Sequence, residues 1–316
     1  MKLTKKDVLN ISKIFNLGAV ENYNLIKGGL VNYNYLLNTK KGKYIVRIIG
    51  DKSPKALKEL DLQFKIFEYL KNKKFPYLIP SPLERDNSRK ILNIGSKKVW
   101  VYEMISGKNF DRPSMLQIKL MAKTLATYHK YISGLKGVKQ KDESEKRILQ
   151  NFKKMKKITL RDEADKLALK YKDYFMEIFD KVKKIKDSSK QLFVHGDFDS
   201  SNVLFKGDKL IGIIDFGDSF YAPRIFDVSV SIRDSCYTRG KIDMKKVKIF
   251  LREYEKVNKL SKKEKSMIIP TILKANVDFF VWAYVEMKKE KENRKKYMKE
   301  MIDLTKDIID NGVTIK

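Results

Sequence analysis

The stretch Phe193-Val-His-Gly-Asp-Phe-Asp-Ser-Ser-Asn202, followed by Ile213-Ile-Asp-Phe-Gly-Asp218, decides the fold of this chain. Asp197 and Asn202 share a loop after a short apolar strand, and Asp215 ends a second apolar run. Phosphoryl transfer needs a carboxylate that orients the acceptor hydroxyl, together with an amide and a carboxylate that hold Mg²⁺ on nucleotide phosphates. The pattern therefore predicts Asp197 as the catalytic base, with Asn202 and Asp215 as metal ligands.

The composition is that of a folded globular protein. The chain has 316 residues, 42% of them hydrophobic, which is enough for two lobes with a sizeable core. Cys236 is the single cysteine, so no intrachain disulfide can form, and the N-terminal residues lack an apolar secretory block. No apolar run approaches the roughly 18–20 residues that cross a bilayer. We therefore expect a cytoplasmic protein without a membrane span.

The net charge of +30 raises the alternative of a basic nucleic-acid-binding module. The lysines are spread along the whole chain, however, and arginine, the residue favoured for base-edge contacts, is a minority. We interpret most of these lysines as solvated helix faces whose field helps attract a nucleotide. A nucleic-acid partner is accordingly not expected.

Strand patterns fill the first third of the chain and helical patterns the remainder. Short aromatic and β-branched runs separated by turn residues predict strands at Tyr23–Ile26, Tyr33–Asn38, Tyr44–Ile49, Ile91–Ile94 and Val99–Met104. Between the third and fourth of these strands, Ser53 is a good N-cap and Pro54 a good first-turn residue for one helix. Further helical periodicity covers Ser114–Ile132, 141–187, 241–257 and 262–310. We predict an α+β, bilobal organisation with lobes at 1–102 and 108–316 joined by a hinge at 103–107.

The block His195-Gly-Asp-x-x-x-x-Asn202 with Ile214-Asp-Phe-Gly-Asp218 resembles the aminoglycoside phosphotransferase and choline kinase superfamily, relatives of eukaryotic protein kinases. Met121–His129 and Ala222-Pro-Arg-Ile-Phe-Asp227 also fit that family. The resemblance implies a protein-kinase-like fold: a small antiparallel sheet with one helix that covers the nucleotide, and a larger helical lobe that carries catalysis and substrate binding. It also implies ATP and Mg²⁺, and a role for Asp227 in anchoring the catalytic loop. We interpret His195 as a buried ring that supports this loop through hydrogen bonds.

The N-terminal segment Lys27-Gly-Gly-Leu-Val-Asn-Tyr-Asn-Tyr35 resembles the nucleotide-covering hairpin of choline kinases and protein-kinase-fold homoserine kinases. Gly28 and Gly29 would let the backbone approach phosphates, and Asn32 would add a polar contact.

Arg47 stands where a kinase strand carries its phosphate-contacting lysine. An arginine there needs a carboxylate to hold it. Glu59 on the following helix is the predicted partner, with Glu68 as the alternative. The resemblance further implies that backbone groups of the connector bind adenine, at Glu103, Met104 and Ile105.

The acceptor site is less defined by the sequence. Asp218 could contact substrate, lie near the metal or cap a turn. Trp282 and Tyr284 on a late helix could surround a quaternary ammonium through cation–π contacts, although core packing is the commoner role.

These motifs predict transfer of a γ-phosphate to a hydroxyl of a small, amine-bearing molecule. The candidates are an amino alcohol such as choline or ethanolamine, homoserine, or an aminoglycoside. A protein Ser/Thr kinase is the alternative, disfavoured by the short interval from Asp215 to Asp227.

Overall fold

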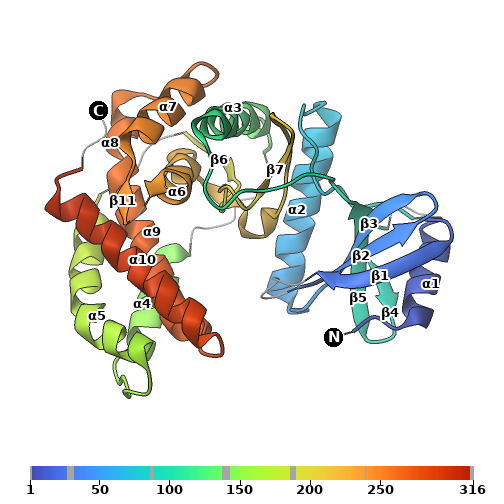
Figure 1. The fold of residues 1–316 in the computed structure, drawn as a ribbon, viewed down its shortest axis with the longest axis horizontal. Coiled ribbons are helices and arrows are strands. Elements are labelled where there is room, and N and C mark those ends of the chain that lie inside the picture. The colour runs from blue at the N-terminus through green and yellow to red at the C-terminus, as the bar shows by residue number, and fades with distance from the viewer. Residues whose placement is uncertain are drawn as a thin grey trace. The chain divides into compact units, whose positions relative to one another are not determined.

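The computed structural model describes residues 2–26, 32–85, 89–136, 143–185, 190–238 and 240–313 (Figure 1). The chain divides into two compact units. The first consists of Met1–Lys108, Leu204–Gly207 and Ile211–Gly217, and the second of Asn109–Val203, Asp208–Leu210 and Asp218–Lys316. A strand-rich first part and a helical remainder confirm the predicted α+β class. The assignment of 103–107 as a hinge stays a prediction.

The first unit is built on a five-stranded antiparallel sheet in the order β1-β2-β3-β5-β4. Its strands are β1 (Val20–Ile26), β2 (Tyr33–Thr39), β3 (Gly42–Ile48), β4 (Leu92–Ile94) and β5 (Lys97–Glu103). Because side chains alternate between the two faces of a strand, β3 directs Val46 and Ile48 to one face and Arg47 to the other.

Two helices pack on this sheet. Helix α1 (Lys5–Ile14) places Val8 and Ile11 in the apolar cluster that contains Val46 and Ile48. Helix α2 (Pro54–Asn72) lies on the face of Arg47, where the Phe64 ring meets the Trp100 ring edge-on at 5.3 Å between centroids. The predicted N-cap is confirmed, since the Ser53 side chain accepts a hydrogen bond from the Ala56 N–H.

The second unit is mainly helical. Its helices are α3 (Met115–Ile132), α4 (Ser144–Lys154), α5 (Glu163–Val182), α6 (Ile225–Ser235), α7 (Met244–Glu255), α8 (Lys262–Ser266), α9 (Ile268–Glu286) and α10 (Lys291–Asp310). Helices α4, α5, α9 and α10 share one apolar cluster, in which Phe175 and Phe280 stack with ring centroids 4.1 Å apart.

Short strands surround the segment that carries the predicted chemistry. Strand β6 (Gln191–Val194) pairs antiparallel with β9 (Phe220–Pro223), and β7 (Val203–Lys206) pairs with β8 (Lys209–Ile213). A 3-10 turn covers Phe216–Asp218, and β10 (Tyr237–Thr238) pairs with β11 (Lys241–Ile242).

One segment of the described chain, Lys262–Glu286, is long and apolar enough to cross a membrane by length and composition alone. Within its apolar window, 56% is buried inside the structure, and Val277, Phe280 and Val281 belong to the cluster shared with α5 and α10. A largely buried position of this kind is that of a core helix.

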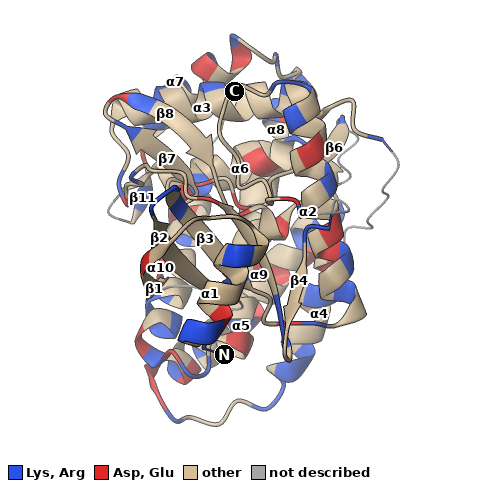
Figure 2. Cartoon of the chain, turned by 90° about the vertical axis from the view of Figure 1, so that its right-hand side faces the viewer, with Lys and Arg blue, Asp and Glu red and all other residues tan. Residues whose placement is uncertain are grey.

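Charged residues are distributed over many elements. Figure 2 shows Lys and Arg on helices and loops throughout the chain, with Asp and Glu interspersed among them. This arrangement agrees with the interpretation of the lysines as parts of solvated helix faces.

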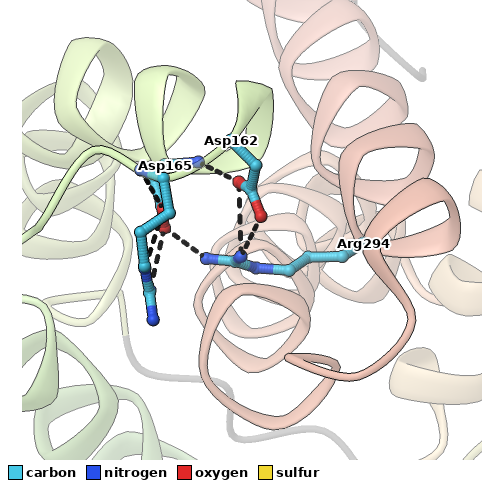
Figure 3. Close-up of polar contacts among 4 residues, drawn as sticks. Asp162, Asp165 and Arg294 are labelled. Carbon is cyan, nitrogen blue, oxygen red and sulfur yellow. Dashed lines mark hydrogen bonds and ion pairs between the residues drawn. The ribbon is translucent and has the colours of Figure 1, made fainter.

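An ion-pair network joins α5 and α10 inside the second unit (Figure 3). The Arg294 guanidinium is nearly buried and lies 3.1 Å from Asp162 Oδ2 and 2.8 Å from Asp165 Oδ1. Arg161 Nε lies 3.1 Å from the other oxygen of Asp165. Burial alone would raise the pKa of Asp165, but hydrogen bonds from Arg161 and Arg294 outweigh it and hold that pKa well below its usual range.

Candidate active site

The loop that carries Asp197, the predicted catalytic loop, begins at a glycine that no other residue could replace without rearrangement. Gly196 follows β6 with φ of +88°, in the left-handed region that favours glycine. A Cβ at this position would lie 2.0 Å from the carbonyl oxygen of Asp218. The loop before Asp197 and the turn at Asp218 are therefore in direct backbone contact.

Asp227 of α6 holds the start of this loop. Its side chain is fully buried and accepts hydrogen bonds from the His195 N–H at 2.7 Å and the Gly196 N–H at 2.9 Å. The buried His195 ring accepts from the Asp197 N–H through Nδ1 at 3.3 Å. These bonds fix the backbone on both sides of Gly196, so the position of Asp197 is set by the second unit itself.

Asn202 is tied to the predicted base. Its side-chain amide nitrogen donates to the backbone oxygen of Asp197 at 2.8 Å and to Asp197 Oδ2 at 2.9 Å. The amide oxygen of Asn202 therefore points away from Asp197. An oriented amide oxygen is a hard ligand of the type that Mg²⁺ prefers, so the residue fits the predicted role.

Two further carboxylates lie next to Asp197. Oxygens of Asp197, Asp199 and Asp234 all lie within 4.8 Å of one another. Asp199 accepts the Asn202 N–H at 3.1 Å, which closes the loop. Arg233 is nearly buried and donates two hydrogen bonds of 2.7 Å to Asp234.

This environment perturbs the predicted base. Burial, together with the neighbouring charges of Asp199, Asp234 and Asp218, raises the pKa of Asp197 to about 8, while Arg233 opposes the rise. Perturbed carboxyl groups of this kind are typical of catalytic sites.

The sequence interpretation missed Asp199, Arg233 and Asp234. A signal for Asp234 was present, because it lies seven positions after Asp227 (234 − 227) and thus on the same face of one helix. Arg233 and Asp199 carried no comparable signal.

In the first unit, Arg47 lies between cross-strand neighbours. Asn34 on β2 and Trp100 on β5 are its direct partners in the sheet register. Arg47 Nε donates to Asn34 Oδ1 at 2.8 Å, and the guanidinium lies 5.5 Å from the centre of the Trp100 ring. Arg47 Nη1 is 3.9 Å from Asp215 Oδ1. The structure thus brings together two predicted site residues, Arg47 and Asp215.

Asp215 has an unusual backbone and an accessible side chain. Its φ is +60°, a left-handed value that aspartate tolerates better than most residues, and its side chain is 52% exposed. The next residue, Phe216, packs edge-on against Phe67 of α2 at 5.1 Å between ring centroids. The buried Phe216 ring thereby fixes the chain beside an exposed carboxylate that can accept a metal ion.

The other predicted nucleotide contacts have different positions. Gly28 and Gly29 lie outside the described residues. Asn32 Oδ1 accepts the Gly50 N–H at 3.1 Å, which ties the start of β2 to the end of β3.

For Arg47, the carboxylate that it approaches in the described part of the chain is Asp215. Pairing with Glu59, which lies half-buried on α2, stays a prediction.

The connector is partly engaged in the sheet. The Met104 N–H donates to the Lys43 carbonyl at 2.9 Å, and the Ile105 carbonyl accepts the Gly107 N–H at 3.0 Å. Adenine contacts at Glu103, Met104 and Ile105 stay a prediction, with the Met104 N–H already used within the chain.

The two aromatic residues proposed for substrate lie on α9. Tyr284 is 5% exposed, and the Arg294 guanidinium lies 4.3 Å from its ring centre. The Tyr284 ring therefore already stacks on a cation of the chain itself. Trp282 is half-buried and stacks on Phe279 with centroids 5.3 Å apart.

The antiparallel sheet, which carries Arg47, and the helical unit, which holds Asp197 and Asn202 on one anchored loop, are the features expected of a phosphotransferase with a protein-kinase-like fold. The model of the family described as "Phosphotransferase enzyme family" (APH) matches residues 22–255, and the chain belongs to this family.

Relatives and solved structures agree with this class. A homoserine kinase of Methylobacillus flagellatus is 24% identical over 255 residues, covering 80% of this chain and 76% of its own. Amicoumacin kinase hAmiN, solved in complex with AMP-PNP, Ca²⁺ and Ami, superposes with a TM-score of 0.69 at 16% identity, over 95% of this chain and 94% of its own. A microcompartment-associated aminopropanol kinase gives 0.66 at 13% identity, over 96% and 98%. The chain is a small-molecule kinase with a hydroxyl acceptor.

Proposed function

We propose that this chain transfers the γ-phosphate of ATP to a hydroxyl of a small molecule that also carries an amine. The observation that carries the proposal is the locked pair on the catalytic loop. One amide group of Asn202 holds both the backbone and the side chain of Asp197, on a loop that Asp227 anchors. A base and a metal ligand kept in a fixed relation are what in-line phosphoryl transfer requires.

Each residue has a role in this proposal. Asp197 accepts the proton of the acceptor hydroxyl and keeps that oxygen directed at the phosphoryl group. The Asn202 amide oxygen and the Asp215 carboxylate are the predicted ligands of Mg²⁺, which would neutralise charge on the phosphates. Arg47, oriented by Asn34, contacts phosphate oxygens. A cytoplasmic location, where ATP is available, is part of the proposal.

The charge around Asp197 supports an acceptor with an ammonium group. Three carboxylates lie together there, and the guanidinium beside them is bound by one of the three. A cationic group on the acceptor would relieve their mutual repulsion. Homoserine and aminopropanol, the acceptors in the names of two of the similar proteins, are both amine-bearing alcohols.

A panel of homoserine, aminopropanol, ethanolamine, choline and aminoglycosides, with ADP release as the readout, tests the proposal. We expect at least one amine-bearing alcohol to stimulate ADP release in the presence of Mg²⁺. Asp197→Asn should lower kcat for that acceptor by about 10³-fold, within the range for loss of a general base.

Asp208→Asn is the matched control, because Asp208 is exposed at the turn between β7 and β8. It should retain wild-type turnover. Normal turnover in Asp197→Asn would refute the assigned base. Stimulation by none of the acceptors in the panel would refute the acceptor class.

A further inference from the structure

The Asp227 carboxylate lies within hydrogen-bonding distance of three groups. Besides the two backbone N–H groups of the catalytic loop, its Oδ2 lies 2.8 Å from Nε2 of His129, and both side chains are fully buried. An ionised carboxylate can only accept hydrogen bonds. The hydrogen-bond pattern therefore assigns a proton to Nε2 of His129.

The other ring nitrogen of His129 has its own buried partner. Nδ1 lies 2.7 Å from the hydroxyl oxygen of Tyr254, on α7, which is also fully buried. In a neutral imidazole with its proton on Nε2, Nδ1 is an acceptor. The Tyr254 hydroxyl must therefore donate to it, and burial raises the pKa of Tyr254, which keeps that proton in place.

Tyr254 also interacts with a nearly buried cation, Arg224. The Arg224 guanidinium acts on the Tyr254 hydroxyl and opposes the rise of its pKa that burial causes. Arg224 is bound in a fork by Glu264, at 2.6 and 2.9 Å. Arg224, Tyr254 and His129 therefore form a series of hydrogen bonds in which each group donates to the next. The series ends at the Asp227 carboxylate.

We propose that Tyr254 is a positioning residue for phosphoryl transfer, because its hydroxyl fixes the Nε2–H tautomer of His129 and so keeps Asp227 bound to the catalytic loop. The inference rests on the proposed role of Asp197. If the proton moved to Nδ1, a lone pair of Nε2 would face Asp227 Oδ2 at 2.8 Å with no hydrogen between them. The carboxylate would then reorient, and with it the His195 and Gly196 N–H groups that lead to Asp197.

The tautomer can be observed directly. The chain contains two histidines, so ¹⁵N NMR of the full-length, histidine-labelled protein yields two ring systems, and a His129→Asn variant assigns them. In the wild type at neutral pH, His129 should show a protonated Nε2 and an unprotonated Nδ1. A protonated Nδ1 in the wild type would overturn the proposal without any Tyr254 variant.

Tyr254→Phe removes the hydroxyl and keeps the ring. We expect its His129 signals to shift toward a mixture of tautomers, and kcat for homoserine or aminopropanol, whichever is turned over, to fall about tenfold, with KM for ATP changed less than twofold. Misplacement of a catalytic group by a fraction of an ångström is enough for such a loss.

Tyr174→Phe is the matched control, because the Tyr174 hydroxyl is buried on α5 and has no hydrogen-bond partner among the described residues. It should leave both the NMR spectrum and kcat unchanged. A Tyr254→Phe enzyme with a wild-type tautomer would overturn the proposal, whether its kcat falls or not.

The proposal for Tyr254 and the proposed function can fail independently of each other. If Asp197→Asn keeps full turnover while Tyr254→Phe alters the His129 tautomer, the function fails and the hydrogen-bond chain stands. If Asp197→Asn is inactive and the Tyr254→Phe spectrum is that of the wild type, the function stands and the positioning role fails.

Discussion

Asp197 and Asp165 are two carboxylates of the same helical unit with opposite surroundings. Asp165 is fully buried between Arg161 and Arg294, which hold its pKa well below the usual range despite the burial that opposes them. Asp197 is half-buried beside two more carboxylates, and burial with their charges raises its pKa to about 8. Burial acts in the same direction at both sites, so the partners decide the outcome.

The contrast is the one expected between a structural site and the proposed catalytic site. The Asp165 network joins α5 and α10 and leaves no charge of the carboxylate unmatched. At the Asp197 site, the described residues bring three carboxylates together with one guanidinium, that of Arg233. Active sites commonly retain such unfavourable interactions at a cost in stability.

Removing the charge of Asp197 should have the largest effect. In Asp197→Asn, kcat should fall about 10³-fold, while the melting temperature at pH 9 should rise, because the mutual repulsion with Asp199 and Asp234 decreases. Thermal denaturation monitored by circular dichroism checks the second effect, with Asp208→Asn for comparison. A lower melting temperature in Asp197→Asn would mean that the Asp197 charge stabilises the fold.

The opposite result is expected at the structural site. Arg294→Met should lower the free energy of unfolding by about 3 kcal/mol, because Asp162 and Asp165 lose a buried partner. The kcat of the folded fraction should remain unchanged. Lys295→Met removes the same charge from an exposed position of α10 and should cost less than about 0.5 kcal/mol. Equal losses for the two variants, measured by urea unfolding, would contradict the assignment.

The opposite pKa shifts of the two carboxylates predict that their contributions to stability respond to pH in opposite directions. Because the folded pKa of Asp197 is raised, its contribution to stability is present below about pH 4 and is lost as the pH rises toward 8. The pKa of Asp165 is lowered, so its contribution is present above its unfolded value and is lost in acid.

Catalysis should follow the deprotonated form of Asp197. We expect kcat/KM for the acceptor to increase up to about tenfold per pH unit and to level off near pH 8. A profile that is flat between pH 6 and 9 would show that no group of this kind limits the reaction.

The smallest effect is expected in the first unit, where an amide orients Arg47. Asn34→Ala should raise KM for ATP about fivefold through loss of one hydrogen bond, worth about 1 kcal/mol, with little change in kcat. Asn38→Ala, which removes an exposed hydrogen bond from the same strand, is the control. An unchanged KM in Asn34→Ala would show that Arg47 needs no support from β2.

Local signals in the sequence were sufficient for much of the fold. Ser53 and Pro54 begin α2 as predicted, since a cap and a first-turn proline act within a few residues. Helix α6 was harder to anticipate, because it is rich in β-branched residues and is buried almost all round, so it has no exposed polar face. Its helical state depends on tertiary packing rather than on propensity.

For the site, the sequence supplied the residues of one contiguous motif and missed those that the fold brings to it. Asp197 and Asn202 share a loop, so their spacing alone suggested a joint role. Arg233 and Asp234 reach the same place through the packing of α6, which no short motif encodes. The stacking of Arg294 on Tyr284 is likewise a contact between two helices, and the sequence of α9 alone does not predict it.

The most direct test of the central claim is ³¹P NMR of a reaction with Mg²⁺, ATP and the amine-bearing alcohol that is turned over. The wild type and Asp208→Asn should convert the γ-phosphate resonance into that of a phosphate ester of the acceptor, while Asp197→Asn should yield almost none. Formation of the same ester by Asp197→Asn at a rate comparable to the wild type would contradict the account.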